Sequence, residues 1–187
     1  MSNAIKASFI LAAVGGFITT LMHVPRLLGW NLVPDYQLRL LIFILLGILF
    51  SIGFIGLWRK SGNVIPLVCA IFIILMDIVD PVLQYLVDFT TLFFFTTFSW
   101  ADVMGITMII YGVAYLTAGI SAWLLREEFS PFSIVAALVF FAFGAVNLVI
   151  ALVDPVGIML PTQDWWYWFD SATGIVTGIY FLDAART

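Results

Sequence analysis

The sequence predicts an all-helical integral membrane protein with six transmembrane helices. Of its 187 residues, 64% are apolar and 10% are charged, and the mean hydropathy is +1.16. A soluble domain is about 45–50% apolar and about 25% charged, because it needs a polar surface. Several apolar stretches here reach the roughly 20 residues that a helix needs to cross a bilayer. The predicted helices are about 6–25, 36–58, 63–81, 102–125, 131–154 and 166–184.

The basic residues predict the orientation of these helices. With the N-terminus inside the cell, five basic residues lie on the inner side and two on the outer side. Cytoplasmic segments of membrane proteins carry such an excess of Lys and Arg. We therefore expect a multi-pass protein of the inner or plasma membrane, with the lipid bilayer as its partner and both termini in the cytoplasm. The inner residues are Lys6, Arg59, Lys60, Arg126 and Arg186, and the outer ones are Arg26 and Arg39.

Local signals predict how the helices begin and pair. Asp35, Asp102 and Asp170 each precede an apolar run, where a carboxylate can accept hydrogen bonds from the first backbone N–H groups of a helix. We expect these three aspartates to be helix caps. The short segments 60–63 and 127–129 predict tight turns, so the helices on either side of each turn should pack as antiparallel neighbours.

The sequence predicts one helix pair that occurs three times. The motif Val-Asp-Pro-Val at 79–82 recurs at 153–156, and Trp-x-Asp at 100–102 recurs at 168–170. Each pair consists of an apolar helix that ends at proline and a return helix that begins near an aspartate. Such internal similarity indicates a repeat architecture. We expect a single membrane domain with repeats of about 6–60, 61–128 and 129–187.

Glycine and proline recur at corresponding places in the three repeats. The pattern consists of Val14-Gly15-Gly16, Pro25, Gly47 and Gly53, then Asp80-Pro81, Gly112 and Gly119, then Gly144, Asp154-Pro155, Gly174 and Gly178. A chain of this length with this pattern resembles the HdeD family of membrane proteins. The resemblance implies three short repeats of two membrane helices and a role in bacterial acid resistance at the cell envelope. It implies no reaction, because the molecular activity of that family is not established.

Four polar residues are predicted to lie at one depth in the outer half of the membrane. Asp77 and Asp80 are three positions apart and therefore share one helix face. His23 and Asn147 fall at a comparable depth on two other predicted helices. An ionisable residue within a membrane is costly and suggests function by default, so these four residues are candidates for binding a proton or another ligand. In the alternative interpretation Asp77 stays protonated and bonds Asn147 or a backbone carbonyl, while Asp80 reaches the lipid headgroups.

Glycines predict close contacts between helices. Gly105, Gly112 and Gly119 recur every seven residues and form one stripe on their helix, and Gly174 and Gly178 form a GxxxG motif. Small residues let helix backbones approach each other in lipid. We expect these contacts within the chain, and also in a homo-oligomer or a larger membrane complex.

The composition excludes several classes of function. The net charge is −4 without a basic cluster, so nucleic acid is not an expected partner. The single cysteine, Cys69, and the single histidine, His23, cannot form a disulfide, an iron–sulfur cluster or a bis-histidine haem site within one chain. We expect no cofactor, no metal site and no enzymatic activity, because no nucleophile is paired with a base. Two hypotheses remain: a non-enzymatic HdeD-like protein or accessory subunit of a membrane complex, and a small transporter or channel with a polar layer.

The predicted orientation determines which positions an impermeant thiol reagent can reach. Gln163→Cys should be labelled in intact cells, whereas Glu128→Cys and Thr187→Cys should be labelled only after lysis. Native Cys69 lies within the predicted helix 63–81 and should give little background. Labelling of Glu128→Cys in intact cells, together with protection of Gln163→Cys, would overturn the orientation.

Overall fold

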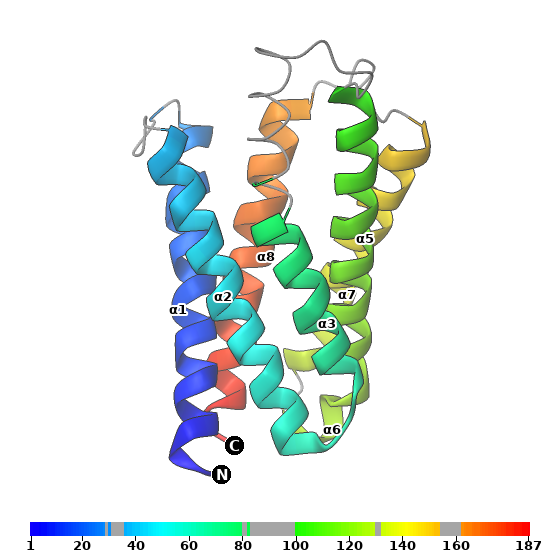
Figure 1. Ribbon diagram of the computed structural model, residues 1–187. Helices are drawn as coiled ribbons and strands as arrows, with labels where there is room; N and C mark the ends of the chain where they lie inside the picture. The colour runs from blue at the N-terminus through cyan, green and yellow to red at the C-terminus, as the bar shows by residue number, and fades with distance from the viewer. Residues whose placement is uncertain (29, 31–35, 80–81, 83–99, 130–131, 154–161) are drawn as a thin grey trace.

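Helices and turns make up the computed structural model of the protein, with no β-strand among the residues that it describes (Figure 1). Each of the six predicted helices coincides with a helix in the structure, and the third continues into a π-helical turn. The described residues are 1–28, 30, 36–79, 82, 100–129, 132–153 and 162–187. The elements are α1 (Asn3–Leu27), α2 (Tyr36–Ser61), α3 (Ile65–Ile74), the π-helical turn (Leu75–Val79), α5 (Trp100–Leu124), α6 (Arg126–Phe129), α7 (Phe132–Val153) and α8 (Thr162–Ala184).

Four stretches of helix in the described chain are long and apolar enough to cross a membrane, as expected of a helical membrane protein. The segment Ile65–Ile78 is apolar but shorter than these. Helix α8 has 23 residues, but its threonines, aspartates and aromatic residues lower its hydropathy. The four stretches are Asn3–Pro25, Leu38–Ser61, Gly105–Leu124 and Phe132–Val153.

The long helices form a closed ring. Helix α2 packs between α1 and α3, α5 packs between α3 and α7, and α8 packs between α7 and α1. Neighbouring helices run in opposite directions, and both chain termini lie at one end of the bundle, here called the terminal end (Figure 1). The predicted antiparallel pairing of α2 with α3 and of α5 with α7 is confirmed.

The turn between α2 and α3 needs a glycine. Gly62 has a φ of +71°, a backbone conformation that glycine adopts without the steric penalty of a Cβ. Its N–H donates to the carbonyl oxygen of Trp58 at 2.8 Å. The side-chain oxygen of Asn63 then accepts from the backbone nitrogen of Ile65 at 2.9 Å. These bonds satisfy backbone groups at the end of α2 and the start of α3.

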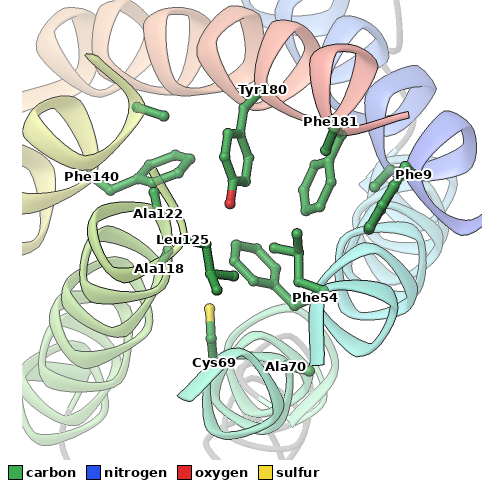
Figure 2. Packing of buried hydrophobic residues seen from close by; sticks show 14 of the residues in the cluster. Phe9, Phe54, Cys69, Ala70, Ala118, Ala122, Leu125, Phe140, Tyr180 and Phe181 are labelled. Atoms are coloured by element: carbon green, nitrogen blue, oxygen red, sulfur yellow. The ribbon is translucent and has the colours of Figure 1, made fainter. Parts of the chain in front are cut away.

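Aromatic side chains fill the centre of the ring toward the terminal end (Figure 2). Phe181 of α8 stacks on Phe9 of α1 with ring centroids 6.0 Å apart, and it meets Phe54 of α2 edge-on at 5.3 Å. Tyr180, also on α8, points into the centre of the ring, toward the helix that carries Cys69. All five side chains are buried. The ring contacts of Phe181 join α8 to α1 and α2.

Glycines form the closest helix crossings. A Cβ added to Gly16 of α1 would lie 2.5 Å from the backbone nitrogen of Gly178 and 2.6 Å from the carbonyl oxygen of Gly174, both on α8. A Cβ added to Gly144 of α7 would lie 2.9 Å from the carbonyl oxygen of Gly112 on α5. Two helices approach this closely only where neither carries a side chain at the crossing.

Other glycines face side chains instead of backbone. Gly119 of α5 lies against Phe141 of α7, with 2.8 Å between an added Cβ and the ring. Gly53 of α2 lies against Ala12 of α1, whose Cβ an added methyl group would overlap. Gly105, the first residue of the predicted stripe, is partly buried on α5. Contacts of these glycines with a second copy of the chain stay a prediction.

Two adjacent glycines of α1 provide a matched test of the α1–α8 crossing. Gly16→Ala should lower the thermal stability in detergent, because its methyl group meets α8 backbone that cannot rotate away, and such overpacking costs about 1–3 kcal/mol. Gly15→Ala should be nearly neutral, because its closest neighbour is the Leu49 side chain at 3.2 Å and alanine favours the helix. Equal melting temperatures for the two variants would contradict this role of the crossing.

Candidate functional site

A histidine from the first helix meets an aspartate from the last helix inside the ring. The Nδ1 atom of His23 lies 3.7 Å from the Oδ2 atom of Asp170. His23 is only 4% exposed, and the Asp170 side chain is 26% exposed. The His23 ring also lies against Phe43 of α2 and Tyr167 of α8, with centroids 5.9 and 5.6 Å away. The imidazole therefore has one carboxylate and two aromatic rings around it.

The glycine crossing of α1 and α8 places this pair. One turn beyond Gly16, the Thr20 hydroxyl lies 3.2 Å from the carbonyl oxygen of Gly16 and 3.2 Å from that of Ser171 on α8. His23 is three positions further along α1, and Asp170 directly precedes Ser171. Since residues three or four apart lie on one face of a helix, the face of α1 that touches α8 also carries His23.

Asp77 lies in the π-helical turn, packed against the backbone of α2. It is 9% exposed, and a Cβ added to Gly47 of α2 would overlap the Cβ of Asp77. Glycine at position 47 thus leaves the room that the Asp77 side chain occupies. A π-helical turn is uncommon and often occurs at functional sites, because the extra residue redirects a side chain. The depth of Asp77 in the membrane stays a prediction.

Tyr115 of α5 interacts with Thr173 of α8 and, electrostatically, with both aspartates, Asp170 and Asp77. The contact with Thr173 is a hydrogen bond between the two side chains. The Thr173 hydroxyl donates to backbone carbonyl groups of its own helix, so its oxygen is left to accept from Tyr115. The Phe143 ring of α7 holds Tyr115 in place, edge to face at 4.4 Å. We call His23, Asp77, Tyr115 and Asp170 the polar layer.

Of the other two residues of the predicted site, the structure describes Asn147 but not Asp80. Asn147 of α7 is completely buried, but its side-chain nitrogen donates to the carbonyl oxygen of Phe143 at 2.8 Å, within its own helix. Its side-chain oxygen accepts no hydrogen bond from the part of the chain that the structure describes. The alternative interpretation offered Asp77 two partners, Asn147 or a backbone carbonyl, and the described hydrogen bond of Asn147 lies within its own helix. Asp80 lies outside the described residues.

The sequence interpretation assigned Asp170 to the wrong role. Helix α8 begins at Thr162, so Asp170 lies more than two turns inside the helix and cannot cap it. Asp102 likewise follows Trp100, the first residue of α5, and Asp35 lies outside the described residues. The useful signal in the sequence was the one that pointed to Asp77, namely an acidic residue inside an otherwise apolar stretch.

The polar layer is suited to exchanging protons. The His23 imidazole contacts the Asp170 carboxylate, and the Tyr115 phenol interacts electrostatically with Asp170 and Asp77. In a low-dielectric interior, ionised groups are expensive unless they are paired. A pair of titratable groups such as His23 and Asp170 can exchange a proton.

A small cavity lies next to the polar layer, on the side of the aromatic core. It has a volume of about 40 Å³, and Tyr115 and Thr173 form part of its wall. Most of the lining is apolar and includes Phe54, Met76 and Phe140, with Thr19 and Thr177 as further polar members. The cavity is therefore a mainly apolar space beside the polar layer.

Comparison with known proteins adds no relative. No protein-family model, no curated protein and no solved structure matches the chain. The resemblance to the HdeD family therefore depends on the sequence pattern of glycines, prolines and aspartates alone. The function must be argued from the residues of the polar layer and from the arrangement of the helices that carry them.

A double-mutant cycle tests whether His23 and Asp170 interact. His23→Gln and Asp170→Asn should each lower thermal stability in detergent, and their effects should be coupled by about 0.5–3 kcal/mol, as is usual for contacting residues. The control is Asp183→Asn, which changes an aspartate near the other end of α8 and should combine additively with His23→Gln. Additivity of His23→Gln with Asp170→Asn would show that the two side chains do not interact.

Proposed function

We propose that the protein is a non-enzymatic, multi-pass protein of a cell membrane that binds and releases protons in its polar layer. The observation that carries this proposal is the His23–Asp170 contact of 3.7 Å inside an apolar helical ring. Six helices would cross the membrane as three repeated pairs, with both termini in the cytoplasm. The pairs would be α1 with α2, α3 with α5, and α7 with α8.

The arrangement of the chain supports this topology. Consecutive long helices alternate in direction, and the two termini share one end of the bundle (Figure 1). Arg59 and Lys60 lie in the last turn of α2, and Arg126 directly follows α5, so these basic residues lie at the terminal end as well. The positive-inside rule then favours the cytoplasmic side for that end.

Protonation of His23 changes the interaction between α1 and α8. Histidine ordinarily gains its charge between about pH 8 and pH 5. A charged imidazole would face the Asp170 carboxylate as an ion pair, whereas a neutral ring would not. Gain of a proton by His23 should therefore strengthen the contact between the two helices as long as Asp170 is ionised, and protonation of Asp170 should remove the ion pair.

This chemistry fits the envelope and acid-stress role that the HdeD resemblance implies. His23 and Asp170 lie in the half of the bundle away from the termini, so the proposed topology places their contact toward the outside of the cell. External acid would reach that half first. A role as an accessory subunit of a membrane complex is compatible with the same site, because a change at the α1–α8 contact can be passed to a partner that packs on these helices.

A small proton transporter or channel is the second candidate. It is favoured by the polar layer, in which side chains from α1, α5, α8 and the π-helical turn converge. The aromatic core favours the first candidate, because buried apolar side chains occupy the centre of the ring toward the termini (Figure 2).

Infrared difference spectra of the protein in lipid vesicles would test the proposal. We expect carboxyl and imidazole bands that change as the pH is lowered from about 8 to 5, and the coupled change should disappear in Asp170→Asn and in His23→Gln. Asp183→Asn should keep it. Identical pH-dependent spectra for Asp170→Asn and the unmodified protein would refute proton binding at this site.

A proton-flux measurement in the same vesicles separates the two candidates. The non-enzymatic protein without transport should show the spectral change and no flux above that of empty vesicles. Flux that is lost in Asp77→Asn, a substitution that keeps the shape of the protonated side chain, would establish the transporter instead.

A further inference from the structure

A groove opens between α1 and α2 at the terminal end of the bundle. It has a volume of about 250 Å³, which is room for the headgroup of a lipid but not for a second helix. Its wall on α1 is formed by Ala4, Ile5 and Ser8, and its wall on α2 by Ile52, Ile55 and Arg59. The groove thus has one charged end and a mainly apolar remainder, and it is remote from the polar layer.

Gly56 determines the shape of this groove. A Cβ added to Gly56 would overlap the hydroxyl oxygen of Ser8 and would lie 2.9 Å from the Phe9 ring. The two helices therefore touch at this level and leave a shallow hollow beside the contact. The Ser8 hydroxyl donates to the carbonyl oxygen of Ile5 at 2.6 Å, so its hydrogen is already engaged. The floor of the groove is consequently small and well packed.

Arg59 supplies the charge of the groove. Its side chain is exposed, and no carboxylate of the described chain lies within ion-pair distance of it. Two other basic residues at this end do have partners. Arg126 pairs with Glu127 at 3.2 Å, and the Lys60 nitrogen lies 4.2 Å from the centre of the Phe129 ring and bonds Thr187. Arg59 is the basic residue that lines the groove, so it is the cation that can receive an anion bound there.

We propose that this groove binds one anionic phospholipid of the leaflet that faces the termini. The phosphate would accept hydrogen bonds from the Arg59 guanidinium, whose planar fork suits phosphate oxygens. One acyl chain would lie along Ile55 and Ile52, which extend about 10 Å from Arg59 toward the membrane centre at 1.5 Å per residue. Basic pockets between membrane helices on the cytoplasmic side are typical sites for anionic headgroups.

Native mass spectrometry of the full chain tests this site with phosphatidylglycerol and phosphatidylcholine of identical acyl chains. The unmodified protein should retain one phosphatidylglycerol in preference to phosphatidylcholine. Arg59→Gln should weaken phosphatidylglycerol binding roughly fivefold, which corresponds to the ~1 kcal/mol that one basic residue contributes at an anionic surface. Phosphatidylcholine binding should not change. Arg59→Lys should keep most of the preference, because the charge remains.

Arg126→Gln is the matched control, since it removes a cation at the same end that already has a partner in Glu127. It should leave phosphatidylglycerol binding unchanged. Equal binding by Arg59→Gln and the unmodified protein would overturn the proposal. So would displacement of the lipid by millimolar inorganic phosphate, which would mean that the headgroup alone is recognised. A lipid-free dimer that Ile55→Trp dissociates would assign the groove to a second copy of the chain.

Discussion

The approach of α1 and α8 through bare backbone holds the ring closed. In lipid, apolar surfaces gain little from being buried against each other, so helices associate through close packing and hydrogen bonds. Gly16, Gly174 and Gly178 provide that packing, because no side chain separates the two backbones. This close approach also determines two contacts further along α1. Thr20 reaches the carbonyl oxygen of Ser171, and His23 comes to lie beside Asp170.

The two halves of the ring divide stability and polarity between them. Toward the termini, aromatic rings from α1, α2 and α8 interlock with the small side chains of α5 and α7. In the other half, the ring accommodates an imidazole and two carboxyl groups that oppose folding unless they are paired or protonated. Gly47 shows how tightly these groups are fitted, since one added methyl group on α2 would overlap Asp77. The close packing toward the termini offsets the free-energy cost of burying polar groups in the other half of the ring.

Helix positions were predictable from the sequence, but the composition of the polar layer was only partly so. Long apolar stretches locate helices without any knowledge of packing, and charged residues inside them, such as His23 and Asp77, stand out. Asp170 was mistaken for a cap because the start of its helix depends on the aromatic segment before it, which could equally have been a loop. Tyr115 could not be predicted as part of the polar layer, because the side of α5 that faces the other polar residues depends on how that helix is rotated about its axis. The glycine contact between α5 and α7 fixes that rotation.

The closing contact joins residues 151 positions apart in the chain, and this has a consequence for biosynthesis. A chain made from its N-terminus inserts α1 long before α8 is available. During that interval the glycine face of α1 is open to lipid and to the insertion machinery, and His23 has no carboxylate beside it. Assembly of the ring therefore ends, and does not begin, with its tightest contact. A product that stops short of α8 lacks Asp170 and leaves the glycine face of α1 uncovered.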